Sequence, residues 1–221
     1  MPYCVTSKNK KITRQPNLLN KEEILTKFSI HSEQEKNLQK YIDSIIKYNF
    51  HTNLVGKSTL ADPWSKHILD SLQLISFIKN KSHSILDMGT GAGLPGVVLS
   101  IVGYKNISLV DSNGKKIKFL KRIKDDLGLD LNIIIGRLEK IHNLKFDIIT
   151  SRALAKLNIL FGYSQNFMKK NTVLIFLKGK TVNEEIFEAK KNWKFEFQKY
   201  QSVSDTRGVI LVIERLSRTN D

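Results

Sequence analysis

The first part of the chain carries apolar residues at helical spacing. Residues 21–28 predict a short helix. A second helix is expected to open at a capping box of Ser32 and Glu35 and to end near Asn49. Its apolar stripe, at i, i+3 and i+4 spacing, consists of Leu38, Tyr41, Ile42, Ile45 and Ile46.

A third helical pattern runs from about residue 62 to residue 78, with Pro63 at its start. We therefore expect residues 21–80 to form a helical cap that precedes the first strand. Residues 81–221 would form the sheet core of the same domain. Residues 1–20 carry four basic side chains and no acid, and we expect them to be a basic N-terminal extension.

After residue 80, short apolar runs alternate with helical patterns. Strands are predicted at Ile85–Met88, Ile107–Val110, Leu131–Ile135, Phe146–Thr150, Val173–Leu177, Lys194–Tyr200 and Val209–Glu214. Helices are predicted at Pro95–Val102, Lys115–Leu127, Ala153–Lys169 and Val182–Asn192. This alternation indicates an α/β fold with a mostly parallel sheet of seven strands. The last two strands are joined only by residues 201–208, so they should pair antiparallel.

The glycine-rich stretch 84–96, SILDMGTGAGLPG, follows the pattern of a buried strand, a tight turn and a helix. Two interpretations fit it. Residues 91–96 match G-x-G-x-x-G, and Asp111 lies 20 positions after Gly91, which is the fingerprint of a dinucleotide site. However, D-x-G-x-G-x-G followed by an acid at the end of the second strand looks like the methyl-donor site of class I methyltransferases. A P-loop is excluded because no Gly-Lys-Ser/Thr follows the turn.

Asp87 favours the methyl-donor interpretation. It lies at the carboxyl end of the first strand, where its carboxylate would repel the two phosphates of a dinucleotide and favour a cation. S-adenosylmethionine carries a sulfonium and an ammonium and has no phosphate. We therefore expect the donor to contact Asp87, Gly89, Gly91 and Gly93, with Asp111 accepting hydrogen bonds from the ribose.

The composition indicates which class of partner the protein binds. The 36 Lys and Arg residues outnumber the 21 Asp and Glu residues and give a net charge of +15. This excess favours a polyanion such as nucleic acid, although A/T-rich codon usage would also raise the lysine content. No apolar run reaches the roughly 18 residues of a membrane span, and residues 1–20 lack the apolar segment of a signal peptide. The single cysteine, Cys4, fits a reducing compartment, so we expect a cytoplasmic monomer.

Several motifs, in a fixed order, make the chain resemble one family. They are His67-Ile68-Leu69-Asp70-Ser71-Leu72, Leu86 to Gly96, Val110-Asp111-Ser112 with Lys115-Lys116, Thr150-Ser151-Arg152-Ala153, and Leu177-Lys178-Gly179. The set looks like the bacterial small-subunit ribosomal RNA guanine-N7 methyltransferases, the glucose-inhibited division protein B or RsmG family. The resemblance spans about residues 28–215. It implies a class I methyltransferase, Rossmann-like fold and methylation of one guanine in the decoding-centre loop of 16S rRNA.

The resemblance also implies donor contacts at Gly89, Leu94, Leu138, Glu139 and Arg152. Leu138 would offer backbone groups to the adenine edge, and Glu139 would accept from its exocyclic amine. Arg152 would pair with the donor carboxylate or with an RNA phosphate. A helix-terminus charge for Glu139 and an ordinary ion pair for Arg152 are the alternative interpretations.

His67, Lys178 and Arg207 are the candidate contacts to the RNA. His67 shares a helical face with Asp70 and Ser71, which would either line the guanine entrance or form a strut between cap and sheet. Lys178 is expected at the carboxyl end of the fifth strand, where substrate arrives in such sheets, and Arg207 lies in the following hairpin loop.

The sequence offers no candidate general base and no metal-ligand cluster. Guanine N7 has a lone pair and no proton, so its methylation requires neither. The competing interpretations are a nicotinamide-dependent oxidoreductase, an RNA-binding protein without activity, and a 2′-O-ribose methyltransferase. The first differs in its cofactor, the second in lacking methyl transfer and the third in its target atom.

Overall fold

The computed structural model describes residues 19–219. Most of the basic extension predicted at residues 1–20, including Cys4, therefore lies outside the described residues. Helix α1 (Lys21–Lys27) begins at a capping box that was not predicted from the sequence. The side chain of Asn20 accepts from the Glu23 amide at 3.0 Å, and the Glu23 carboxylate accepts from the Asn20 amide at 2.8 Å.

Helix α2 (Ser32–Asn49) buries the predicted stripe, but the cap predicted at Ser32 is wrong by one residue. His31 is the residue with extended backbone angles, and its amide donates to the Gln34 side chain at 3.0 Å. Because this bond closes the first turn on His31, Ser32 is already inside the helix.

The third helical stretch is less regular than the single α-helix predicted for residues 62–78. A 3₁₀ turn covers Lys57–Ala61, and π-helical turns cover Trp64–Leu69. One α-turn, α3 (Asp70–Leu72), and a 3₁₀ segment (Gln73–Phe77) complete it. Two side chains of this stretch, His67 and Asp70, contact Arg152 at the end of β4.

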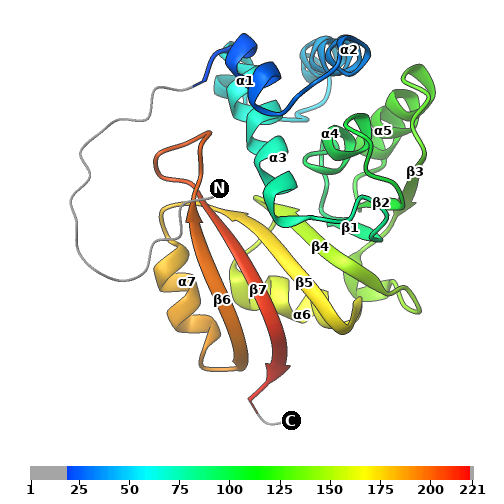
Figure 1. The fold of residues 1–221 in the computed structure, drawn as a ribbon. Coiled ribbons are helices and arrows are strands. Elements are labelled where there is room, and N and C mark those ends of the chain that lie inside the picture. Colours follow the sequence, from blue (N-terminus) through cyan, green and yellow to red (C-terminus); the bar gives the residue numbers. More distant parts are fainter. Residues whose placement is uncertain (1–18, 220–221) are drawn as a thin grey trace.

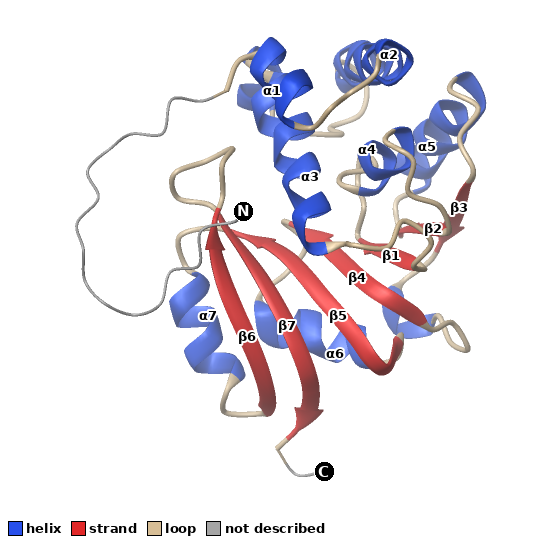
Figure 2. Ribbon diagram, viewed as in Figure 1, coloured by secondary structure: helices blue, strands red, loops and turns tan. Residues whose placement is uncertain are grey.

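The sheet has seven strands in the order β3-β2-β1-β4-β5-β7-β6 (Figures 1 and 2). The strands are β1 (Ile85–Met88), β2 (Ile107–Asp111), β3 (Leu131–Ile135), β4 (Phe146–Arg152), β5 (Met168–Lys178), β6 (Trp193–Gln201) and β7 (Val209–Arg218). The first five are parallel, and β6 and β7 pair antiparallel, as predicted. β7 also pairs antiparallel with β5, which was not predicted.

Both faces of the sheet are covered, because alternate residues of each strand enter two different apolar cores. Ile85, Leu109 and Ile175 belong to the core beneath the N-terminal helices, α4 (Gly96–Ile101) and α5 (Gly114–Asp126). The next residues along their strands face the core beneath α6 (Leu157–Gln165) and α7 (Val182–Ala189). The helices thus sandwich the sheet (Figure 1), and the N-terminal helices share their core with it.

The helix predicted at Ala153–Lys169 is shorter at both ends. Ala153 has a φ of 52°, a left-handed conformation that a helix cannot contain, and α6 begins only at Leu157. At the other end, Met168 and Lys169 belong to β5. The residues after β4 therefore form a loop at the carboxyl edge of the sheet. No helix within residues 19–219 is long and apolar enough to cross a membrane.

Candidate functional site

The carboxylate of Asp87 is completely buried beneath the glycine turn and accepts three hydrogen bonds. Its Oδ2 accepts from the Thr90 hydroxyl at 2.5 Å and from the Gly96 amide at 3.1 Å. Its Oδ1 accepts from the hydroxyl of Thr150, its register partner on β4, at 3.0 Å. Asp87 therefore ties β1, the turn, the first residue of α4 and β4 together.

This position changes how Asp87 acts on a ligand. The carboxylate was expected from the sequence to contact the donor, but it points into the protein and does not line the adjacent cavity. Burial raises the pKa of Asp87 to about 6, and the bonds from Thr90 and Gly96 partly oppose this rise. The Gly96 amide, which a phosphate at this turn would need, is already bonded to an internal anion.

The other glycines of the turn have different roles: one permits close packing, and another leaves room for a ligand. Gly89, Gly91 and Gly93 all have positive φ. A Cβ at Gly93 would lie 2.4 Å from Val97 and 2.8 Å from Leu120, so Gly93 permits close packing of the turn. A Cβ on Gly91 would meet nothing closer than 3.8 Å, which leaves its surface open to a ligand.

Asp111 braces the same turn from β2. Its Oδ2 accepts from the Gly91 amide at 2.9 Å and its Oδ1 from the Asn113 amide at 2.8 Å. A carboxylate can accept about four hydrogen bonds, so Asp111 retains acceptor capacity beside Gly91. The geometry is compatible with the ribose contact expected from the sequence, although Asp111 is nearly buried.

Tyr41 of α2 holds the turn from the side of the helical cap. Its buried hydroxyl donates to the carbonyl of Ala92 at 2.8 Å, across 51 residues of sequence. Tyr41 was predicted only as part of the apolar stripe, and this contact was missed. A tyrosine within a buried stripe is the available signal, because a buried hydroxyl needs a hydrogen-bond partner.

A cavity of about 450 Å³ opens above the turn. Gly89, Gly91 and Leu94 line it from the turn, His67 and Asp70 from the third helical stretch, and Arg152 from the end of β4. Its volume lies within the range of small-molecule sites, roughly 300–1,000 Å³. These predicted residues therefore lie around one cavity.

Arg152 joins the helical cap to the sheet. Its Nη1 donates to the carboxylate of Asp70 at 3.1 Å and to the carbonyl of Lys66 at 3.1 Å, and its Nη2 contacts Nδ1 of His67 at 3.2 Å. The ordinary ion pair, one of the two interpretations of Arg152, is thus present. These bonds use three of the five N–H groups of a guanidinium, so Arg152 retains donors for a further anion.

The contacts of His67 define its tautomer. The Thr59 hydroxyl donates to the Gly56 carbonyl at 2.6 Å, so Nε2 of His67, 2.9 Å away, carries the proton that it shares with Thr59. Nδ1 then accepts from Arg152. Burial, together with the charge of Arg152, lowers the pKa of His67 to about 4. His67 is therefore neutral and fully bonded, as a strut requires, and it also lines the cavity.

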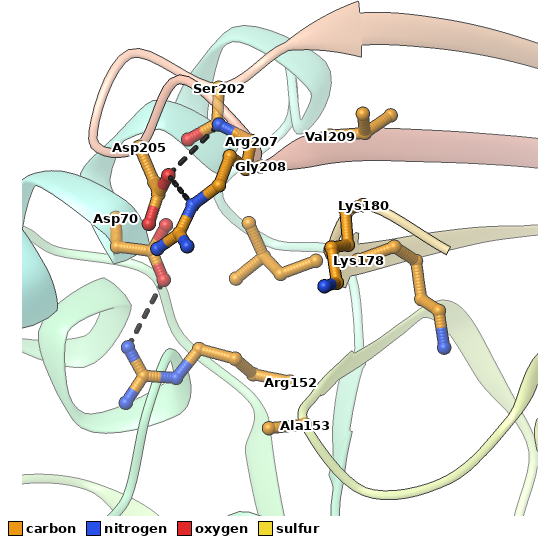
Figure 3. Close-up of a pocket in the computed structure, with 12 residues that line it drawn as sticks. Asp70, Arg152, Ala153, Lys178, Lys180, Ser202, Asp205, Arg207, Gly208 and Val209 are labelled. Atoms are coloured by element: carbon orange, nitrogen blue, oxygen red, sulfur yellow. Dashed lines mark hydrogen bonds and ion pairs between the residues drawn. The ribbon is translucent and has the colours of Figure 1, made fainter. Parts of the chain in front are cut away.

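A second hollow, of about 410 Å³, adjoins the cavity at Arg152 and Asp70 (Figure 3). Lys178 and Arg207, the two basic residues expected to meet RNA, both line it. They differ in availability. The guanidinium of Arg207 lies 3.4 Å from Asp205, and its side chain is 76% exposed.

Lys178 does not fit the RNA contact expected of it. Its ammonium forms a 2.6 Å ion pair with Glu185 of α7, and both side chains are about nine-tenths buried. It also donates to the Ala155 carbonyl, and Glu185 accepts from the Leu157 amide at the start of α6. This neutralised pair holds the loop that follows Arg152.

Leu138 and Glu139 lie outside both hollows. They form part of a 3₁₀ turn (Leu138–Lys140) after β3, which lies near Asp111 because the Gly136 amide donates to the Asp111 carbonyl at 3.1 Å. The side chain of Leu138 is buried in the core, and that of Glu139 is exposed. Leu138 and Glu139 follow β3, whereas Arg152 ends β4, so they lie on opposite sides of Asp111. Their contact with an adenine stays a prediction.

Comparison with known proteins identifies the family. The family model described as rRNA small subunit methyltransferase G matches residues 34–211. The chain belongs to the rRNA small subunit methyltransferase G family. Proteins named ribosomal RNA small subunit methyltransferase G are similar to it. That of Paramagnetospirillum magneticum is 34% identical, over 89% of this chain and 96% of that protein. That of Rickettsia prowazekii is 39% identical, over 86% and 98%.

Solved structures support the fold assignment. A ribosomal protein L11 methylase from Lactobacillus delbrueckii subsp. bulgaricus has a TM-score of 0.56 at 20% identity, covering 66% of this chain and 76% of that one. A TehB-like SAM-dependent methyltransferase from Corynebacterium glutamicum has a TM-score of 0.52 at 16% identity, covering 69% and 89%. At these identities the likeness concerns the fold alone, and it is the class I methyltransferase fold that was predicted.

The buried Asp87 makes the stability of this methyltransferase G family member depend on pH. The carboxyl ionises near 3.8 when unfolded and near 6 when folded, so the folded state binds an additional proton between these values. We expect the free energy of unfolding of the wild type, relative to Asp87→Asn, to fall by about 3 kcal/mol as the pH rises through this window. Urea unfolding of both proteins from pH 4 to pH 7 measures the difference.

His67 titrates in the opposite sense, because its folded pKa is lowered, but this contribution is common to both proteins and cancels. A stability difference that stays constant across the window would contradict the assignment of the buried charge to Asp87.

The hydroxyl of Tyr41 should affect both stability and donor binding. Tyr41→Phe leaves the Ala92 carbonyl without its partner and should lower the free energy of unfolding by about 1–2 kcal/mol. It should also weaken the binding of S-adenosylmethionine, because Ala92 lines the cavity. Denaturant unfolding and titration calorimetry measure the two effects.

Tyr104→Phe is the matched control, since the buried hydroxyl of Tyr104 donates to the Ile78 carbonyl at 2.7 Å away from the turn. It should lower stability to a similar extent and leave donor affinity unchanged. Equal loss of donor affinity in the two variants would indicate a general effect of destabilisation.

Proposed function

We propose that this chain methylates the N7 atom of a guanine in the decoding-site loop of 16S rRNA, with S-adenosylmethionine as the methyl donor. The observation that carries the proposal is the family match over residues 34–211, because it includes every residue that lines the two adjoining hollows. The substrate is then the small ribosomal subunit or its RNA, and the enzyme acts in the cytoplasm.

The glycine turn fits this donor better than it fits a dinucleotide. The Gly96 amide at the start of α4 already donates to Asp87, so it is not available as a hydrogen-bond donor to a pyrophosphate. S-adenosylmethionine supplies a methyl group on a positively charged sulfur and has no phosphate that would need this donor. This observation favours a methyltransferase over the oxidoreductase that the same glycine pattern allows.

Each of these residues would bind a different part of the donor, according to its chemistry. Gly89, Gly91 and Leu94 would hold it from the turn. Asp111, with acceptor capacity left beside Gly91, would bind the ribose hydroxyls. Leu138 and Glu139 would bind the adenine beyond Asp111.

Arg152 would bind the donor carboxylate. Three of its N–H groups hold Asp70, Lys66 and His67, which orients the guanidinium, and the remaining N–H groups can donate to the carboxylate. The strut of His67 and Asp70 thus positions Arg152 at the boundary between the donor cavity and the second hollow.

Within residues 19–219, the imidazole that lines the donor cavity is not free to act as a base, which suits guanine N7. His67 is the imidazole that lines the donor cavity, and both of its ring nitrogens are engaged. An atom with a lone pair and no proton requires no proton removal, so holding the guanine in line with the donor supplies the catalysis. A ribose hydroxyl would need a base, which disfavours the 2′-O-methyltransferase.

Labelled methyl transfer to small ribosomal subunits tests the function. Subunits that lack the modification are incubated with the enzyme and labelled S-adenosylmethionine, and N7-methylguanine is mapped by borohydride reduction and aniline cleavage. We expect one cleavage site, in the decoding-site loop. Label on a ribose or on an exocyclic amine would contradict the target atom, and no label would contradict the activity.

The pH dependence of a single turnover tests the mechanism. Because no base is titrated, the rate of methyl transfer at saturating substrates should be flat from about pH 7 to pH 9. A limb with an apparent pKa in that range would indicate a general base and would contradict this mechanism.

A further inference from the structure

A third hollow, of about 280 Å³, continues the groove away from the donor cavity. It shares Gly179, Lys180, Arg207 and Val209 with the second hollow, which in turn shares Asp70 and Arg152 with the donor cavity. We call this third hollow the outer hollow. Its other lining residues come from the start of α7, the end of β6 and the β6–β7 loop. The three hollows therefore form one groove along the carboxyl edge of β5 and the β6–β7 loop.

The charge along this groove changes from mixed to positive. The donor cavity and the second hollow both contain Asp70 and Asp205. Among the described residues that line the outer hollow there is no Asp or Glu, and Lys180, Lys199 and Arg207 contribute three cations. The groove is thus suited to an anion that extends away from the donor.

The two lysines are accessible to a ligand for different reasons. Lys199 on β6 donates to the Asn183 side chain at 2.8 Å, which fixes its ammonium at the edge of the hollow with two further donors. Lys180 is exposed and has no hydrogen bond or ion pair within residues 19–219. It lies with Arg207 at the boundary between the two hollows (Figure 3).

The turn between β5 and α7 leaves room for a backbone to pass. A Cβ added to Gly179, which lines both hollows, would meet no atom within 4 Å. The nearby Lys178 does not contribute its charge, because it is neutralised by Glu185. Arg207 is also paired, with Asp205 at 3.4 Å, although its side chain is 76% exposed, so the local cationic character comes mainly from Lys180 and Lys199.

We propose that the outer hollow binds the phosphate–ribose backbone of the RNA that flanks the methylated guanine, with Lys180 and Lys199 on the phosphates. This subsite rests on the proposed function, which places the guanine next to the donor. It determines where the flanking strand leaves the catalytic centre, across the end of β5 and toward α7. With the donor in its cavity, an extended polyanion can occupy the second and the outer hollow at once, which a free nucleotide cannot.

The double variant Lys180→Ala/Lys199→Ala tests the subsite. We expect roughly a tenfold rise in KM for small ribosomal subunits, little change in kcat, and unchanged affinity for S-adenosylmethionine by calorimetry. The logarithmic salt dependence of binding to protein-free 16S rRNA should become shallower by about one unit for each phosphate that no longer has a lysine partner. The Lys180→Arg/Lys199→Arg variant, which keeps both charges, should retain wild-type KM.

Two further variants complete the design. Gly179→Glu adds a carboxylate to the open part of the groove and should weaken RNA binding without removing any hydrogen bond or ion pair of the fold. Lys118→Ala/Lys121→Ala removes two exposed lysines of α5 that line none of the three hollows, and should leave the KM for subunits close to wild type.

Unchanged salt dependence in Lys180→Ala/Lys199→Ala, or an equally large effect in the α5 control, would overturn the subsite. Weakened binding to assembled subunits with unaltered binding to protein-free rRNA would also overturn it, since the partner would then be a ribosomal protein. Binding to rRNA is measured without catalysis, so a failure of the proposed function appears separately, as no methyl transfer by the unsubstituted enzyme.

Discussion

The buried carboxylate of Asp87 is the constraint on which the site depends. It accepts hydrogen bonds from Thr90, Gly96 and Thr150, and so joins β1, the glycine turn, the start of α4 and β4. The cost of burying this charge is large enough to raise its pKa to about 6, even with three donors around it. Its hydrogen bonds fix the shape of the turn. The anion bound at the start of α4 is the Asp87 carboxylate of the protein itself. The ligand at this turn need not carry a phosphate.

The helical cap and the sheet meet at the same place. Tyr41 reaches the turn from α2, and Arg152 reaches Asp70 and His67 from the end of β4. The Asp70 carboxylate also accepts from Ser204 at 2.5 Å, which attaches the β6–β7 loop to the same network. The donor cavity, the second hollow beside it and the loop that carries Arg207 are therefore held in one arrangement by hydrogen bonds between distant segments. This network orients Arg152 at the cavity, and orientation of the reacting groups is the form of catalysis that guanine N7 requires.

Much of this could be predicted from the sequence. Short apolar runs that alternate with helical patterns predicted all seven strands, and the short connection at residues 201–208 predicted the antiparallel final pair, because both are local features. The errors arose where the structure depends on distant partners. Nothing local indicates that Lys178 meets Glu185 in a buried ion pair, or that Tyr41 donates to the turn. Ala153 lies in an apolar helical pattern, yet its left-handed backbone delays the helix. Asp87 was predicted to contact the donor, but the sequence could not reveal that its carboxylate accepts three hydrogen bonds from within the protein.

The central claim is that the glycine turn, already bonded to its own carboxylate, holds a sulfonium nucleoside and no pyrophosphate. Titration calorimetry of the full chain with S-adenosylmethionine and, separately, with NAD tests it most directly. We expect one S-adenosylmethionine to bind per chain and NAD to give no measurable heat of binding. Binding of NAD, or indifference to S-adenosylmethionine, would contradict the account.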